Sequence, residues 1–203
     1  MYRDVEFVCS GNNGRSPIAE AVGKRILDSL GLNANVRITS SGTQVDFSKV
    51  RDLAGFIAPF VEQAIRREIF PRSYAELVKK DSQKVLDEMF EIEETWRNNY
   101  ILNFVNPGFG NHSRQQTLVR SEAQLILPVD QSNFERVAKI YKSSGYSPKI
   151  ETLAEYAGLE YNRPALHNIE ISALASPFNI DRKTILSLNL NNQFREFNNL
   201  FQR

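Results

Sequence analysis

The pattern of apolar and polar residues at the start of the chain predicts a strand, a loop, a helix and a second strand. Residues 5–8 form a short apolar run, typical of a buried strand, that ends at Cys9. Turn-forming residues fill 10–14, and apolar residues then recur at helical spacing over 18–30. A second strand over 36–40 completes the unit, which is typical of the beginning of a parallel α/β sheet.

The later part of the chain is expected to be mostly helical, with two more strands. Pro59 predicts the start of a second helix, and the acidic and amide-rich stretch over 91–99 continues a further one. Apolar runs over 123–129 and 149–153 predict the third and fourth strands. A last helix is expected over 181–201.

Composition and charge narrow the possible functions. The 203 residues suit one domain, and 25 Lys and Arg against 24 Asp and Glu give a net charge of +1. A nearly neutral chain argues against a general nucleic-acid surface or a polybasic membrane surface. No apolar run approaches the roughly 20 residues of a membrane helix, and no signal-peptide pattern opens the chain. We therefore expect a cytoplasmic protein.

The chain has one cysteine, Cys9, and two histidines, His112 and His167, which are far apart in the sequence. One thiol cannot form an internal disulfide, and these three residues do not have the spacing of a metal site. We expect neither a metal nor another cofactor. By itself, Cys9 is either a small buried apolar residue or a reactive thiol.

The residues after Cys9 favour the reactive interpretation, because they form a C-x5-R-S loop between a strand and a helix. Such a loop directs backbone N–H groups and the positive end of a helix dipole at one point, where a phosphate can bind. Arg15 offers a planar fork for two phosphate oxygens, and the same positive field favours the thiolate of Cys9. Ser16 and Pro17 are expected to begin the helix, with Ser16 as its N-cap. The expected phosphate-binding residues are Ser10, Gly11, Asn12, Asn13, Gly14, Arg15 and Ser16.

Other phosphate loops do not fit. The chain has neither the G-x-G-x-x-G of dinucleotide-binding proteins nor the Gly-Lys-Ser/Thr ending of a Walker loop. A C-x5-R spacing alone is common by chance, and a glycine-rich loop is often only a turn. The combination of strand, Cys, two-glycine loop, Arg, Ser, Pro and helix is more specific.

This segment resembles the opening of the low-molecular-weight protein tyrosine phosphatases, whose usual pattern is V-x-F-V-C-x-G-N-x-C-R-S-P-x-A-E-A. Residues 39–43 (TSSGT) resemble the family's D-S-A-G-T, residues 125–133 its I-L-x-M-D-x-S-N, and residues 149–153 its next strand. The resemblance is good over 1–45 and 112–155. It implies one flavodoxin-like three-layer α/β/α domain with a four-stranded parallel sheet in the order 2-1-3-4.

The resemblance also implies a mechanism. Cys9 attacks a phosphoryl group to give a cysteinyl-phosphate, and Arg15 stabilises the equatorial oxygens. Ser16 hydrogen-bonds the thiolate, and Asn12 shapes the loop. Ser40 supports Asn12, and His112 either does the same or is a solvated loop histidine. The substrate is a phosphorylated protein or a small phosphomonoester.

The chain departs from the family pattern in its loop. Gly14 replaces a second cysteine, so the family's protective disulfide should be absent. Asn13 replaces an apolar residue and is expected to make the wall of the crevice more polar. A helical insertion is expected at about 71–106, as a helical hairpin packed on the sheet, a cover for the crevice or a subunit contact.

The family's general acid is also missing. It stands before an aromatic residue in a D-P loop, where this chain has Ser176-Pro177-Phe178. Asp181 is the nearest carboxylate and is expected either to supply the acid or to be a helix-start charge; Asp130 is a weaker candidate. The alternatives to a phosphatase are a phosphate or phosphotyrosine binder without catalysis and an arsenate reductase that uses an external thiol.

Overall fold

The computed structural model describes residues 3–157, which fall into two compact units. The first unit combines the chain up to Val45 with the chain from Arg97 onward, and it carries the sheet. The second unit is helical and spans Asp46–Trp96.

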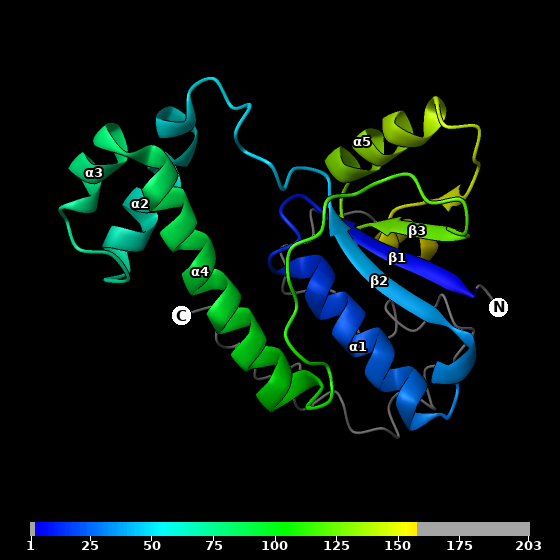
Figure 1. The fold of residues 1–203 in the computed structure, drawn as a ribbon. Coiled ribbons are helices and arrows are strands. Elements are labelled where there is room, and N and C mark those ends of the chain that lie inside the picture. Colours follow the sequence, from blue (N-terminus) through cyan, green and yellow to red (C-terminus); the bar gives the residue numbers. More distant parts are fainter. Residues whose placement is uncertain (1–2, 158–203) are drawn as a thin grey trace. The chain divides into compact units, whose positions relative to one another are not determined.

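A parallel sheet with the order β2-β1-β3-β4 forms the centre of the first unit (Figure 1). The strands are β1 (Asp4–Cys9), β2 (Arg37–Gly42), β3 (Leu125–Pro128) and β4 (Lys149–Ile150). The pairing of β1 with β2 sets Cys9 opposite Gly42, so both strands end at the same edge of the sheet. The predicted four-stranded parallel sheet and its order are confirmed.

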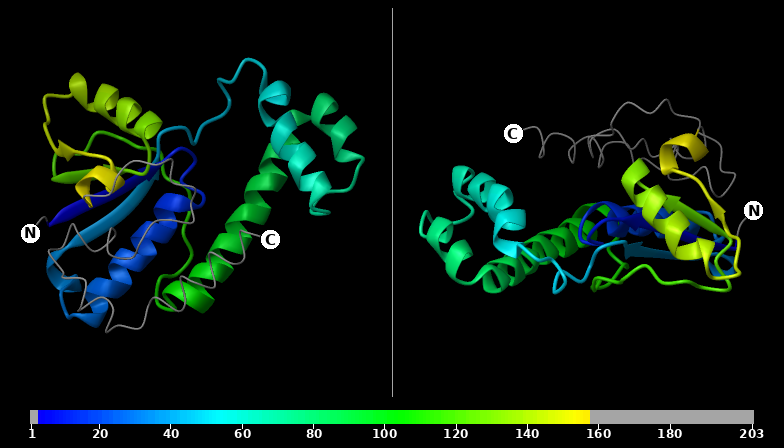
Figure 2. Two further views of the ribbon diagram at one scale, coloured as in Figure 1. Left: turned by 180° about the vertical axis from the view of Figure 1, so that it is seen from behind. Right: turned by 90° about the horizontal axis from the view of Figure 1, so that it is seen from above.

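Helices cover both faces of this sheet, as Figure 1 and the left panel of Figure 2 show. Val5 and Phe7 of β1 pack in one core cluster with the apolar face of α1 (Arg15–Ser29). Val8, which points to the other face, packs in a second cluster with α5 (Gln131–Lys142). The three-layer α/β/α fold is therefore also confirmed. The remaining short elements of this unit are the 3-10 turn η1 (Asn33–Asn35), the π-helical turn η2 (Ile101–Val105) and α6 (Leu153–Tyr156).

Helix α1 begins two residues earlier than the sequence suggested. Arg15 is its first residue and Gly14 its N-cap, so the prediction that Ser16 caps the helix was wrong. Ser16 is fully buried, and its hydroxyl lies within hydrogen-bond distance of the Cys9 sulfur and the Ser41 carbonyl. The hydroxyl of Ser16 is thus in contact with the loop and with β2 and does not cap the helix. Pro17 still lies in the first turn, where its missing N–H has no cost.

The second unit packs α2 (Leu53–Arg66) against α3 (Tyr74–Lys80), together with most of α4 (Ser82–Tyr100). The prediction that Pro59 opens α2 was wrong, because Asp52 caps this helix by accepting a hydrogen bond from Gly55 N at 2.9 Å. The buried core of the unit consists of Ile57, Val61, Phe70, Val78, Val85 and Leu86.

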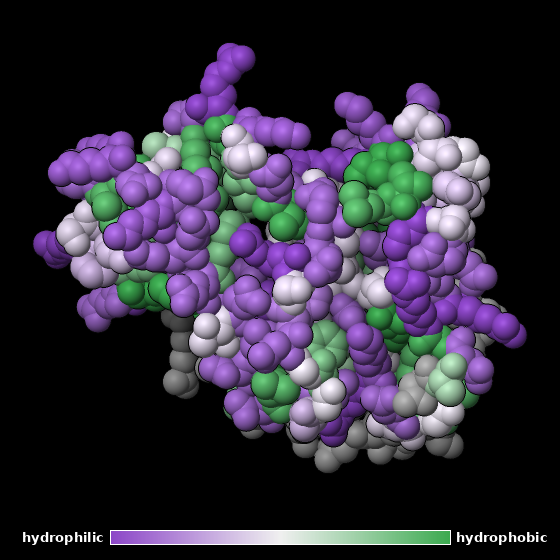
Figure 3. All heavy atoms as spheres, viewed as in Figure 1, coloured by the Kyte–Doolittle hydropathy of each residue, from purple (hydrophilic) through white to green (hydrophobic). Residues whose placement is uncertain are grey.

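The helical segment also differs in extent from the insertion expected at about 71–106. The compact unit starts at Asp46, and the last turn of α4 already belongs to the first unit. Several large apolar side chains of the second unit are exposed, including Phe60 and Ile69, and Figure 3 shows apolar surface among its hydrophilic residues.

The expected helix over 181–201 and the loop with Ser176 and Asp181 lie outside the described residues. Within residues 3–157, no helix is both long and apolar enough to span a membrane.

Candidate active site

Cys9 lies at the carboxyl end of β1, where the chain leaves the sheet and turns toward α1. The residue is buried, and Ser16 Oγ lies 3.0 Å from its sulfur. The loop crosses directly over Gly42 of the neighbouring strand: a Cβ at that position would lie 2.6 Å from the Asn12 nitrogen and from the Ser10 carbonyl oxygen. A glycine at the end of β2 is therefore required for the loop to lie where it does.

Asn12 fixes the conformation of the loop from inside. It is fully buried and has a left-handed backbone, with φ of 51°. Its side-chain amide donates to the hydroxyls of Ser16 and Ser40, both at 3.0 Å. Its Oδ1 accepts from Gln115 N at 2.7 Å and lies 3.0 Å from Nε2 of His112. Both amide hydrogens and both lone pairs of Asn12 therefore have partners.

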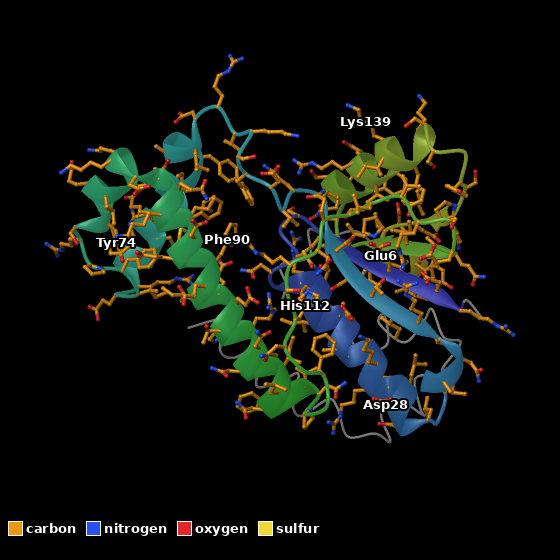
Figure 4. All side chains as sticks on the ribbon, in the orientation of Figure 1. Glu6, Asp28, Tyr74, Phe90, His112 and Lys139 are labelled. Atoms are coloured by element: carbon orange, nitrogen blue, oxygen red, sulfur yellow. The ribbon has the colours of Figure 1, made fainter. Side chains whose placement is uncertain are left out.

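A second layer of side chains holds the partners of Asn12. Ser40 donates to Glu20 Oε2 at 2.6 Å, and Lys24 pairs with the other oxygen of Glu20 at 2.6 Å. The side chain of His112, which Figure 4 labels, is 10% exposed, and its Nδ1 lies 3.7 Å from Oε2 of Glu20. His112 is thus a mostly buried residue in contact with Asn12, not a solvated histidine.

Asp130 and Asn133, at the start of α5, hold the other side of the loop. Arg15 donates from Nη1 to Asp130 Oδ2 at 2.7 Å. Asp130 caps α5 and accepts from Asn133 Nδ2 at 2.8 Å. Asn133 Oδ1 accepts from Thr43 at 2.8 Å, and the Ser10 hydroxyl lies 3.4 Å from it. A guanidinium has five N–H donors, so the bond to Asp130 orients Arg15 without using its full capacity.

Asn13 does not have the position that the sequence suggested. Its side chain is 7% exposed, and its Oδ1 accepts from Arg97 Nη1 at 2.9 Å. The amide oxygen thus makes a structural contact instead of adding a polar surface to a crevice wall. Arg97 comes from the last turn of α4, 84 residues away along the chain.

Sequence reasoning gave no role to Arg97, Glu20 or Asn133. Asn133 stood within the quoted motif, and Glu20 lies one helical turn past Ser16, so their motif positions could have indicated them. No local signal marks Arg97, because only the path of the chain brings it to the loop.

A different polar cluster lies at the amino end of β1. Arg120 donates to Asp4 Oδ1 at 2.6 Å and to Glu6 Oε2 at 3.2 Å. Burial raises the pKa of Glu6 above its usual value, although the hydrogen bond from Ser41 and the charge of Arg120 oppose the shift. Burial acts to lower the pKa of Arg120, but the two carboxylates outweigh it and the net shift is upward.

The arrangement at the loop can bind an oxyanion and attack it. A buried thiol lies at the base of a short loop, a helix begins at Arg15, and a guanidinium stands at its rim. A helix N-terminus with inward N–H groups attracts phosphate, and a nearby sulfur nucleophile can then reach phosphorus. Within residues 3–157, no three His, Cys, Asp or Glu side chains are grouped to hold a metal.

Comparison with known proteins gives a family match for the beginning of the chain. Residues 4–68 match the family described as low molecular weight phosphotyrosine protein phosphatase. The protein-arginine-phosphatase of Bacillus subtilis (strain 168) is 59% identical over 34 residues. That stretch is 17% of this chain and 23% of the relative.

Solved structures of similar proteins align along the chain at low identity. The YwlE mutant from Bacillus subtilis has 19% identity and a TM-score of 0.43, covering 98% of this chain and 99% of its own. Wzb of Vibrio vulnificus, in complex with benzylphosphonate, has 15% identity and a TM-score of 0.42, with 98% and 99% covered. A drosophila arginine phosphatase has 17% identity, a TM-score of 0.42 and 98% of each chain covered. The fold assignment itself rests on the observed strand order.

Proposed function

We propose that this protein, whose residues 4–68 match the low-molecular-weight phosphotyrosine protein phosphatase family, is a cysteine-dependent phosphomonoester hydrolase. The observation that carries the proposal is the position of Cys9: a buried sulfur 3.0 Å from the Ser16 hydroxyl, at the base of a loop that leads into a helix N-terminus. At this position the sulfur can attack a phosphoryl group bound in the loop.

The reaction has two displacements at phosphorus. In the first, Cys9 Sγ forms a bond to phosphorus, the bond to the leaving oxygen breaks, and that oxygen takes a proton from a general acid. In the second, the deprotonated acid takes a proton from water as the water oxygen attacks phosphorus, the S–P bond breaks, and inorganic phosphate and the thiolate are released. Arg15 and the loop N–H groups stabilise the charge on the three equatorial oxygens in both steps.

The assay that tests this proposal uses p-nitrophenyl phosphate. We expect the parent protein to release p-nitrophenol, and Cys9→Ser to abolish turnover while inorganic phosphate still binds, because the cradle is made of backbone N–H groups and Arg15. Isothermal titration with phosphate measures the second part. Hydrolysis by Cys9→Ser at the parent rate would exclude the covalent route.

The general acid falls outside the described residues, and we propose Asp181 for it. Asp130 is suited to a different role, since it is paired with Arg15 and caps α5. Loss of a general acid typically costs about 10²–10⁴-fold in rate, and the cost grows as the leaving group becomes poorer. Asp181→Asn should therefore slow phenyl phosphate far more than p-nitrophenyl phosphate. Equal rates for parent and variant on both substrates would leave Asp181 as a helix-start charge.

The substrate class is a second question for the same site. The family name points to phosphotyrosine, while the curated relative is a protein-arginine-phosphatase. We propose phosphotyrosine in proteins or small aryl phosphates as the substrate. The matched test compares two peptides of one sequence, one with phosphotyrosine and one with phosphoarginine, by kcat/KM. A preference for phosphoarginine would change the substrate class that we assign and leave the proposed mechanism unchanged.

Two other functions remain as outcomes of these assays. A binder without catalysis would retain phosphate and release no product, which Ser176 in place of the family's acid favours. An arsenate reductase would need an external thiol, because Cys9 is the chain's one cysteine. A cytoplasmic location, where the thiol stays reduced, is part of the proposal.

A further inference from the structure

The guanidinium of Arg97 joins two segments of the candidate site that are far apart in sequence. Nη1 donates to the Asn13 carbonyl at 3.2 Å and to Asn13 Oδ1 at 2.9 Å. Nη2 donates to the carbonyl of His112 at 2.6 Å. The side chain is fully buried in the first unit, and Nε and Nη2 also donate to the neighbouring Asn98 side chain.

The bond to the Asn13 carbonyl sets the direction of one backbone N–H. In a trans peptide the C=O and the following N–H point in opposite directions. Because Arg97 holds the Asn13 carbonyl on its own side, the N–H of Gly14 points away from Arg97. A guanidinium on the carbonyl also polarises the peptide and makes that N–H a stronger donor.

Glycine at position 14 makes this control necessary. Glycine has more backbone freedom than any other residue, so the Asn13–Gly14 peptide can rotate more easily than a peptide between two residues with side chains. No neighbouring atom lies within 4 Å of where a Cβ at Gly14 would stand. The loop therefore gains no order from packing at position 14, and the bonds from Arg97 act on that peptide directly.

We propose that Arg97 is a positioning residue that holds the Asn13–Gly14 peptide with its N–H directed at the bound phosphate. The same side chain fixes the His112 segment, so it holds the loop and the support of Asn12 in one arrangement. This inference rests on the proposed function, because it takes the loop to be the oxyanion site. Without Arg97, only a fraction of the molecules has the loop in the conformation that binds an oxyanion. The apparent oxyanion affinity falls in proportion to that fraction.

The test compares Arg97→Gln and Arg97→Lys with the parent, using inorganic phosphate as the probe. The lysine variant keeps the charge but cannot reach both carbonyls with a fixed fork. We expect both variants to raise the inhibition constant of phosphate and the KM for p-nitrophenyl phosphate, by about ten- to a hundredfold for Arg97→Gln. Guanidinium chloride at millimolar concentration should partly restore Arg97→Gln. If Arg97→Gln does not fold, Arg97→Lys carries the comparison.

The control is Arg37→Gln, which also removes one positive charge from the first unit. Arg37 opens β2, at the other end of the strand from Gly42, and its side chain is 55% exposed. We expect phosphate inhibition of this variant to match the parent. Nuclear magnetic resonance adds a direct signature: phosphate should shift the Gly14 amide signal in the parent and shift it less in Arg97→Lys.

Two results would overturn the inference. One is a folded Arg97→Gln protein that is less stable but has the phosphate affinity of the parent, because Arg97 would then only brace α4. The other is an equal shift of the Gly14 signal in parent and variant. Failure of the proposed function is seen separately, as a parent protein that does not hydrolyse p-nitrophenyl phosphate. In that case protection of Cys9 from iodoacetate by phosphate still reports the affinity in each variant.

Discussion

The two ends of β1 carry polar clusters of opposite design. At the amino end, the carboxylates of Asp4 and Glu6 pair with the guanidinium of Arg120, and Arg37 lies 3.7 Å from Asp4. At the carboxyl end, the contacts of Asn12 are with hydroxyls, a backbone N–H and an imidazole. Ion pairs hold the side chains at the amino end of the strand, whereas hydrogen bonds to mostly neutral groups hold Asn12 at the carboxyl end.

This difference is consistent with the proposed oxyanion site at the carboxyl end. A carboxylate among the loop's N–H groups would occupy them and repel phosphate. The carboxylate of Glu20 lies one layer back, on Ser40 and Lys24, and Asp130 meets the loop at Arg15. Buried charges without partners are costly, so the carboxylates at the amino end need their paired cations.

The largest effect is expected at the amino end, from Arg120→Gln. This change leaves Glu6 buried without its cation and leaves Asp4 only the longer contact with the half-exposed Arg37, and breaking such a buried pair costs about 3 kcal/mol of stability or more. Urea unfolding measures the loss, and kcat/KM of the folded protein should stay near the parent value. Arg37→Gln, a half-exposed arginine at the same end, should cost about 0–1 kcal/mol. Equal losses of stability in the two variants would mean that Arg120 is no more important to the buried carboxylates than an exposed arginine.

Gly42→Ala tests the close approach at the carboxyl end. The added Cβ would stand 2.6 Å from backbone atoms of the loop, which must therefore move. A misplaced reacting group can cost about 10²-fold, and we expect a loss of that size in kcat/KM for p-nitrophenyl phosphate. Gly108→Ala is the matched control, since its Cβ would meet no atom closer than 3.6 Å. Parent-like activity of Gly42→Ala would show that the loop tolerates displacement.

Asn12→Ala and Asn12→Gly separate the two contributions of this residue. Both remove the amide and leave buried partners unsatisfied, at about 1–3 kcal/mol for a lost partner. Glycine adopts the left-handed backbone freely and alanine only at an energetic cost, so Asn12→Ala should lose more phosphate affinity than Asn12→Gly. Isothermal titration with phosphate gives the comparison. Identical affinities in the two variants would assign the whole effect to the hydrogen bonds.

The smallest effect concerns the pH dependence of stability in Glu6→Gln. Burial raises the pKa of Glu6 above the usual 4.5, so the folded protein binds this proton more tightly than the unfolded chain does. The contribution of Glu6 to stability therefore falls as the pH rises from about 4.5 through the raised pKa. Glu6→Gln lacks this titration, although Asp4 and Arg120 remain beside it. Urea unfolding at about pH 5 and about pH 7 should show the difference between variant and parent shifting in favour of the variant. A shift in the opposite direction would contradict the raised pKa.

Short-range patterns in the sequence determined the beginning of the fold and the core of the candidate site. The apolar run before Cys9, the turn residues of the loop and the helical spacing after Pro17 indicate a strand, a loop and a helix, because each depends on neighbouring residues. The contacts of Asn12 with Ser40 and His112 were expected from the family resemblance, and the structure contains both. The helix starts were less well predicted: side-chain propensity favoured Ser16 and Pro59, while Gly14 and Asp52 are the caps.

The tertiary structure alone decided which distant groups support the loop. Arg97 is a polar residue in a charged helix by sequence, and the path of the chain turns it into a buried donor to Asn13 and His112. Asn13, which was expected to make the crevice wall more polar, is a buried acceptor for the same reason. Burial and long-range hydrogen bonds depend on how elements pack in space, and local spacing in a sequence contains no record of that packing.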